Sequence, residues 1–385
     1  MPTIPRPPRD TRVDILRGAM QIVIFLSHAQ GSFVGAWLIH KAWGLSDCSE
    51  QFVFLSGLML GSVHARKVLT QGRGAAAKDV LRRAAGLYRT HLLVFALFGI
   101  MIAAVCKGGL FPGEWDRLGW GYFTSHPWFG SLAALATVYM PEYVNILPTF
   151  AWGMALLPAF AWLESKWGDW ALAAPLGVYA CVWLFGLTLP VPAGAHGLGF
   201  NPFAWQALFL LGAWLGRRML LKGEALPANR WLTAGAAGIV LLGLWLRLGW
   251  HGFLPAWLPA PLPDIDVVWQ KNDLAPLRFL HALSLAWLAS CLIPREAGWM
   301  RTGAARWLAM IGRFSLKVFC LGIFLSWLAT AAFRLWPAWA PWIDVPAVAL
   351  GAVLLGLFAR ALDRRAKRAA RPSAEPAPGA AARPT

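Results

Sequence analysis

The sequence predicts an all-α polytopic membrane protein with about ten transmembrane helices and both termini in the cytoplasm. Of its 385 residues, 58% are hydrophobic and only 14% are charged, which lies outside the range of soluble globular domains. Apolar runs near the ~20 residues that cross a bilayer recur ten times along the chain. Lysine and arginine collect in alternate loops between these runs. Together these features predict a multi-pass membrane protein.

The ten apolar runs have approximate bounds that can be read from the sequence: 14–37, 50–69, 88–107, 145–163, 169–190, 202–220, 231–250, 275–293, 311–334 and 344–362. A weaker run, at 128–139, is too short to cross a bilayer. We expect it to form a short helix that lies on the membrane or dips into it. Eleven spans would follow if it crossed.

The distribution of basic residues favours ten spans over eleven. They precede the first run and follow the second, sixth, eighth and tenth, as in Arg12, Arg66 to Arg89, Arg217 to Arg230, Arg295 to Arg306, and Arg364 to Arg371. With ten spans all of them lie on one side, and the positive-inside rule makes that side cytoplasmic. We therefore expect a cytoplasmic segment at 1–11, a transmembrane domain at 12–363, and a basic, Pro/Ala-rich, disordered cytoplasmic tail at 364–385.

Charge and cysteine content exclude several other classes. The formal net charge is +17, but the basic residues lie between long apolar segments and form no continuous face, so they indicate topology and not nucleic-acid binding. The five cysteines show no CxxC spacing. Neither a disulfide framework nor a zinc site is predicted, and we expect no metal.

The first run carries ionisable residues inside an otherwise apolar stretch. Arg17 and His28 lie eleven positions apart, which places them on nearly the same helix face, ~16 Å apart, with Asp14 one turn before Arg17. Such residues at membrane depth mark functional pathways by default. Arg17, near the cytoplasmic surface, suits a phosphate-bearing ligand, whereas His28, deeper in, suits proton transfer. The alternative is a histidine that is hydrogen-bonded inside the bundle for packing alone.

Other polar residues gather near the ends of later runs. In chain order they are Asp47, Glu50, Asn201, Trp205, Gln206, Asp273, Arg278, His281, Arg313, Ser315 and Lys317. Polar capping and snorkelling account for Arg313 and Lys317. Arg278 and His281 lie one turn apart, and capping or snorkelling does not explain them. Glu50 is placed to orient His28 or an incoming hydroxyl.

The ten residues between Arg17 and His28 match the Arg-x10-His pattern of the membrane acyltransferase-3 superfamily. The ordered segments RVDILRG, SDCSEQFVFLSG, NILPTFAWGMALLP, FNPFAWQALFLLGA, KNDLAPLRFLHALSLAWL and IGRFSLKVFCLGIFLS resemble the OpgC family of that superfamily over roughly residues 12–330. The resemblance implies a ten-helix enzyme of the bacterial inner membrane. Such an enzyme moves an acyl group, succinyl in the named family member, from cytoplasmic coenzyme A to hydroxyls of periplasmic glucans.

The resemblance, together with the chemistry and position of the residues, predicts roles for individual residues. The catalytic set is His28, Glu50, Arg278 and His281; the donor-binding set is Arg17, Asp14, Arg82 and Arg83; the acceptor-binding set is Asp47, Asn201, Trp205, Gln206 and Asp273. The donor is succinyl-CoA or acetyl-CoA, and His28 acts as general base or is itself acylated. Arg278, or the amides of Asn201 and Gln206, stabilises the oxyanion. Phe314 and Lys317 replace the histidine and proline expected in the ninth-run motif.

Two other classes remain open on the sequence. A transporter or flippase of an acidic or lipid-linked solute would use Arg17, Arg278 and the two histidines as a relay. A structural membrane subunit would not need intramembrane charges.

Overall fold

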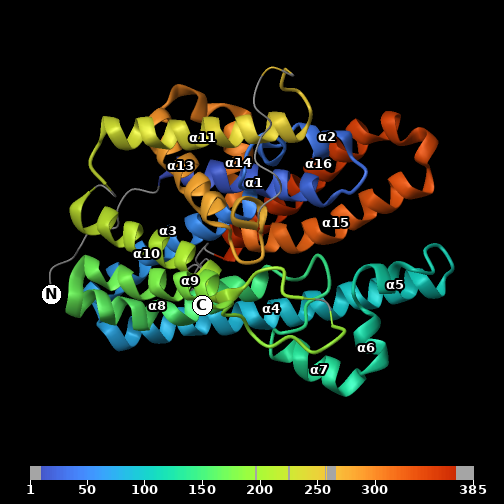
Figure 1. Cartoon of the computed structure of the whole chain (residues 1–385), viewed down its shortest axis with the longest axis horizontal. Coiled ribbons are helices and arrows are strands. Elements are labelled where there is room, and N and C mark those ends of the chain that lie inside the picture. Colours follow the sequence, from blue (N-terminus) through green and yellow to red (C-terminus); the bar gives the residue numbers. More distant parts are fainter. Residues whose placement is uncertain (1–9, 196, 224–225, 256, 258–265, 370–385) are drawn as a thin grey trace, which may run out of the picture.

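The computed structural model describes residues 10–195, 197–223, 226–255, 257 and 266–369. Within these residues the chain is helical, without strands. The long helices lie lengthwise in two groups (Figure 1). One group contains α3 (Cys48–Gln71), α4 (Arg73–Lys107), α8 (Leu147–Trp167), α9 (Ala173–Phe185) and α10 (Pro202–Lys222). The other contains α1 (Thr11–His28), α11 (Arg230–Trp250), α13 (Pro276–Leu292), α14 (Gly303–Arg313), α15 (Ser315–Leu335) and α16 (Ala340–Ala369).

Short elements complete the described chain. They are α2 (Phe33–Trp37), η1 (His40–Ala42), α5 (Glu114–Arg117), α6 (Gly121–Ser125), α7 (Pro127–Leu135), η2 (Gly168–Leu172), α12 (Asp266–Trp269), η3 (Gly298–Arg301) and η4 (Pro337–Trp339). The helix α7 occupies the place of the short helix expected at 128–139, and α5 to α7 project at one end of the molecule (Figure 1).

Each of the ten expected runs overlaps one of the helices α1, α3, α4, α8, α9, α10, α11, α13, α15 and α16. Six stretches of the described residues are long and apolar enough to cross a membrane: Cys48–Gln71, Arg73–Lys107, Leu147–Phe185, Arg230–Trp250, Ser315–Leu335 and Pro337–Ala369. These stretches support a multi-pass membrane protein. The count of ten spans and the side on which the termini lie stay predictions.

The helices run between two ends of the molecule. At one end, which we call the basic end, the start of α1 and the ends of α3 and α10 line one cavity, at Thr11, Gln71 and Met219. At the other, the far end, the residue before α3 meets the segment before α13, where the Lys271 ammonium lies 2.7 Å from the Asp47 carboxylate. The helix α1, which starts at the basic end, therefore runs opposite to α3 and α10, which end there.

The first expected run is not one helix from 14 to 37, because α1 ends at His28 and the chain turns before α2. Gly31 has φ 92°, a conformation that glycine adopts without strain. The Ser32 hydroxyl caps α2 by accepting from the Gly35 amide at 2.8 Å, and it donates to Asp344 at 2.6 Å. Turn chemistry thus overrides an apolar pattern, and His28 becomes the last residue of its helix.

Other helix bounds differ because hydropathy detects only the apolar part of a helix. The helix α4 begins at Arg73, fifteen residues before the expected position 88, with several charged residues in its first turns. The helix α16 continues to Ala369, beyond the expected end at 362. Residues 370–385 of the expected disordered tail and residues 1–9 of the expected cytoplasmic segment lie outside the described residues.

A close helix crossing joins α3 and α10 through two small-residue patterns. Gly57 and Gly61 on α3 face Gly212 and Gly216 on α10, and a Cβ added at any of the four would collide with a backbone oxygen of the other helix. Glycines four positions apart let two membrane helices approach to backbone contact. This crossing holds α3 beside α10 from near the middle of α3 towards the basic end.

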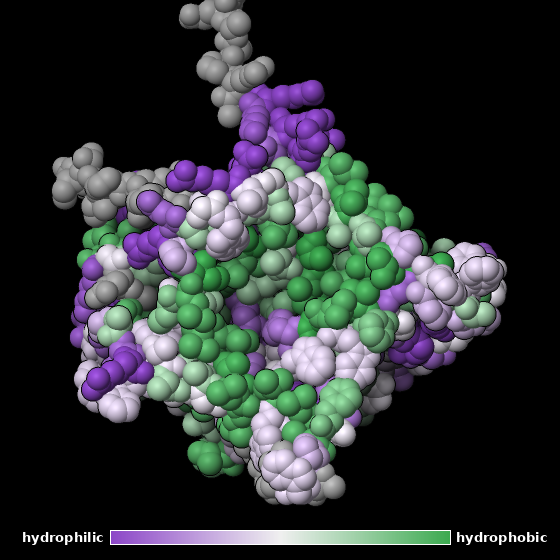
Figure 2. All heavy atoms as spheres, turned by 90° about the horizontal axis from the view of Figure 1, so that it is seen from above, coloured by the Kyte–Doolittle hydropathy of each residue, from purple (hydrophilic) through white to green (hydrophobic). Residues whose placement is uncertain are grey.

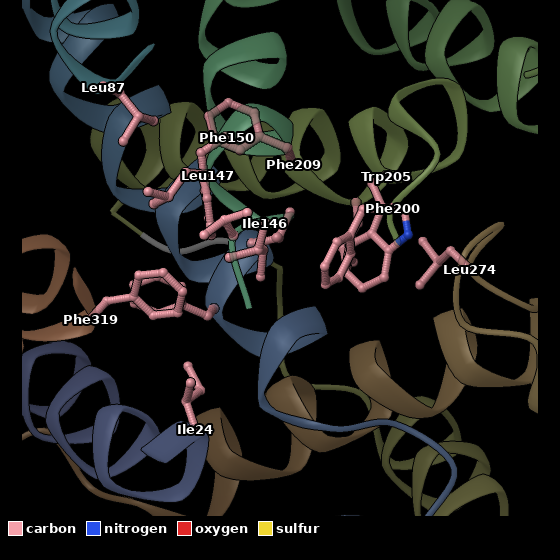
Figure 3. Packing of buried hydrophobic residues seen from close by; sticks show 14 of the residues in the cluster. Ile24, Leu87, Ile146, Leu147, Phe150, Phe200, Trp205, Phe209, Leu274 and Phe319 are labelled. Atoms are coloured by element: carbon pink, nitrogen blue, oxygen red, sulfur yellow. The ribbon is translucent and has the colours of Figure 1, made fainter. Parts of the chain in front are cut away.

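A large apolar cluster joins the two helix groups. Ile24 of α1 and Phe319 of α15 belong to the same cluster as Phe150 of α8 and Phe209 of α10 (Figure 3). Ile24 and Phe319 of one group are 9% and 5% exposed, and Phe150 and Phe209 of the other are 4% and 1% exposed, so the contact between the groups is tightly filled. The face of α1 that carries Ile24 is therefore fixed against the rest of the protein.

We expect Gly57→Ala to destabilise the protein by about 1–3 kcal/mol, because the added methyl group forces two packed backbones apart. Gly86→Ala on α4 is the matched control, since a Cβ there meets nothing within 4 Å. It should be neutral or stabilise by about 0.5–1 kcal/mol, as alanine favours the helix over glycine. Thermal unfolding in detergent compares the two; equal midpoints would contradict the role of the crossing.

Candidate active site

The His28 ring is held in one tautomer at the C-terminus of α1. Its Nδ1 lies 2.8 Å from the carbonyl oxygen of Ile24, one turn earlier, and 3.1 Å from the Ser27 hydroxyl. A carbonyl oxygen only accepts, so Nδ1 carries the proton in this bond. In the neutral ring Nε2 is then unprotonated and free to accept a proton.

The His28 side chain is accessible although it lies among other parts of the protein. Its side chain is exposed, although protein atoms surround it densely and the charges of Lys271 and Asp47 act on it. The Tyr143 hydroxyl donates to the His28 carbonyl at 3.0 Å, and the two rings lie 5.7 Å apart. One face of the molecule is hollowed, with hydrophilic residues visible at the floor of the hollow between hydrophobic ones (Figure 2). His28 is thus an accessible base inside the protein.

Arg17 lies on the same face of α1, towards the basic end. Its guanidinium donates to the Ser315 hydroxyl of α15 at 2.6 Å and to the Met59 sulfur of α3 at 2.8 Å. It also lies 5.4 Å from the centroid of the Phe52 ring. Arg17 therefore connects α1, α3 and α15 at the level where the donor route was expected.

A cavity of about 1150 Å³ opens at the basic end. Its charged lining residues are Arg66, Lys67, Arg83, Arg295, Asp10, Asp14, Asp79 and Glu296. Of the expected donor residues, Asp14 and Arg83 line this cavity, whereas Arg82 is exposed on α4. Asp79 lies 3.1 Å from both Lys67 and Arg83, so part of the positive charge is neutralised within the protein.

A buried ion network occupies the far end. The Glu50 carboxylate, which is 0% exposed, accepts from two nitrogens of Arg278, one of them at 2.9 Å, and from the Asp47 amide at 2.9 Å. Asp47 caps α3 and binds Lys271 at 2.7 Å. Two carboxylates therefore face two cations, and the network joins α3 to α13 and to the loop before it.

His281 lies in an enclosed, tightly packed place. Its Nδ1 is 3.3 Å from the Ser46 amide and 2.8 Å from the Ser46 hydroxyl, and since an amide N–H only donates, Nδ1 is the acceptor. The ring is 2% exposed and is packed between Gly44 and Gly243, where an added Cβ would lie 2.7 Å and 2.8 Å from ring carbons. This arrangement suits packing and orientation.

The residues expected to bind the acceptor around α10 are bonded to the loop before α13. The Asn201 amide donates to Asp273 at 2.7 Å, and the Trp205 indole donates to the Asn272 carbonyl at 3.0 Å. Gln206 donates to the Pro175 carbonyl at 2.8 Å, which ties α10 to α9. A small cavity of about 190 Å³ is lined by Asn201 and Asp273. These contacts hold in place the loop that carries Lys271.

A second charged cluster at the far end was missed by the sequence reasoning. Glu114, 1% exposed, accepts from Arg117 at 2.6 Å, from the Trp327 indole at 2.7 Å and from Arg334. Burial alone would raise the pKa of Glu114, but hydrogen bonds from Arg117, Arg334 and Trp327 prevail and lower it to about 2. Arg117 also donates to Gln30 at 3.1 Å, close to the end of α1. No sequence pattern brings Glu114 to Arg334, because they are 220 positions apart.

A protein-family model described as OpgC protein matches residues 9–367, nearly the whole chain. No curated protein matches the chain, and neither does any solved structure. The family match extends from the residues before α1 almost to the end of α16, so it includes every site described above. The resemblance seen in the sequence is thereby confirmed: this chain belongs to the OpgC protein family.

Proposed function

We propose that the protein is an acyl-CoA-dependent O-acyltransferase of the bacterial inner membrane. It takes an acyl group, succinyl or acetyl, from acyl-CoA at the basic end, which faces the cytoplasm. It passes the group to a hydroxyl of a periplasmic glucan or another glycan at the far end. The observation that carries the proposal is the His28 ring, which is accessible and has Nδ1 bonded to Ile24, so that Nε2 can act as a base.

The donor enters at the cavity of the basic end. The phosphates of coenzyme A find cationic partners there in Arg66, Lys67, Arg83 and Arg295. The attraction between these cations and the phosphates is stronger in the cavity than in bulk water. Because Asp79 competes for Lys67 and Arg83, phosphate binding replaces part of an existing ion pair. The pantetheine arm then extends past Arg17 along α1 towards His28.

The reaction follows from the protonation state of His28. Nε2 removes the proton from the acceptor hydroxyl as its oxygen attacks the thioester carbonyl carbon. The tetrahedral intermediate breaks the carbon–sulfur bond, and the imidazolium returns the proton to the departing thiolate, which leaves coenzyme A and an ester. An acylated His28 is the alternative course, and it would give ping-pong kinetics.

The charged residues of the ion network at the far end differ in whether a substrate can reach them. Arg278 and Glu50 are paired with each other and fully enclosed, so we assign them to positioning the far end. Lys271 acts on His28 electrostatically, and its side chain is 33% exposed. Lys271 is therefore better placed than Arg278 to contact the acceptor or the developing oxyanion.

His28→Ala should lower the transfer rate at least about 10²–10⁴-fold, the usual contribution of a general base, with normal protein abundance. Release of free coenzyme A thiol on addition of glucan measures the rate in purified protein. His126→Ala, at an exposed position on the segment between α6 and α7, is the matched control and should not change it. Comparable rates in His28→Ala and the control would contradict the catalytic role.

Arg17→Met should raise the KM for acyl-CoA about 10–100-fold, because a hydrogen bond to a charged group contributes about 1.5–3 kcal/mol. The substituted side chain retains much of the volume, so kcat should change less. Initial rates over a range of acyl-CoA concentrations separate the two constants. A fall in kcat with an unchanged KM would show that Arg17 does not contact the donor.

Arg278→Met should destabilise the protein by about 3–5 kcal/mol, because it leaves the Glu50 carboxylate buried without its partner. Adding Glu50→Leu to Arg278→Met should recover much of that loss, as both charges are then removed. Thermal unfolding in detergent of the two single variants and the double variant measures the coupling. If Arg278→Met kept normal stability and lost only transfer, Arg278 would contact substrate instead.

A further inference from the structure

Gln21 lies on the α1 face between the two residues of the Arg-x10-His pattern. It is one turn beyond Arg17 and two turns before His28, so it stands ~6 Å and ~10 Å from them along the helix axis. Its side chain is 2% exposed. Hydropathy could not single it out, but the spacing of four and seven positions places it in the same row.

The Gln21 amide has no hydrogen-bond partner among the described residues. Both Oε1 and Nε2 are enclosed and unpaired, whereas Arg17, one turn away, bonds to Ser315 and Met59. A buried polar group without a partner is unfavourable, and native proteins contain few of them. A glutamine with two unpaired atoms in this row points to a ligand that brings both a donor and an acceptor.

The chemistry of that ligand follows from the proposed function, on which this inference rests. The pantetheine arm of coenzyme A contains two amides, each with an N–H and a carbonyl, between the phosphates and the sulfur. A glutamine side chain can donate to one such carbonyl and accept from one such N–H. We propose that Gln21 binds an amide of the pantetheine arm while Arg17 and the basic cavity hold the phosphate end.

The Gln21 amide is enclosed in this structure, so a donor has to displace side chains to reach it. An arm that reaches Gln21 must part the side chains between α1 and its neighbours, among them Arg17 with its bonds to α3 and α15. The new hydrogen bonds to Gln21 then stabilise the opened arrangement. Gln21 thereby favours donors that have the amide arm over simple thioesters.

Binding of two ligands to wild type and to Gln21→Met tests the inference. Coenzyme A has the pantetheine arm, whereas adenosine 3′-phosphate 5′-diphosphate has the same nucleoside and the same three phosphates without it. Gln21→Met should weaken coenzyme A binding about tenfold, equivalent to about 1.4 kcal/mol, and leave binding of this nucleotide unchanged. Isothermal titration calorimetry in detergent gives both affinities.

The thermal unfolding midpoint of the ligand-free protein separates a binding role from a structural one. Removing an unpaired buried amide should leave the midpoint unchanged or raise it. Equal coenzyme A affinity in the two proteins would overturn the inference, as would an equal loss for both ligands or a lowered midpoint. If wild type bound neither ligand, the proposed donor itself would be wrong, and the role of Gln21 would fall with it.

Discussion

The Glu50 carboxylate has no contact with solvent, and the pairing that makes this charge tolerable organises the far end of the molecule. Arg278 and the amide of Asp47 occupy both of its oxygens. An uncompensated charge there would cost several kcal/mol, so α3, α13 and the loop between α12 and α13 keep one arrangement. That arrangement places Lys271 against Asp47 and brings both within electrostatic range of His28.

The helix α1 connects this network to the basic end. Its inner face carries Arg17, Gln21 and His28 in one row, and its apolar residue Ile24 packs into the cluster that joins both helix groups. Because the helix ends at His28, the ring projects at a helix terminus, where it is accessible. The same short turn frees the residues after Gly31 to meet Asp344 of α16. The position of the His28 imidazole, its tautomer and its accessibility thus follow from the end of α1 at this residue.

Much of the fold could be predicted because membrane helices have a strong hydropathy signal, and each of the ten runs overlaps a helix. The break after His28 was hidden because Gly31 and Ser32 lie inside an apolar run. Spacing placed Arg278 and His281 one turn apart, but it did not show that Glu50, 228 positions away, holds the first, or that two glycines enclose the second. Such pairings depend on tertiary contacts between distant segments, which local patterns do not encode.

The proposed function requires that a thioester on one side of the membrane acylates a hydroxyl on the other through His28. The most direct measurement places protein in sealed liposomes, selected for the orientation in which the basic end faces outwards, with glucan inside and radiolabelled acyl-CoA outside. We predict that label accumulates on the enclosed glucan while free coenzyme A appears outside. Intact acyl-CoA inside the liposomes, or labelled glucan only when both substrates share one side, would contradict it.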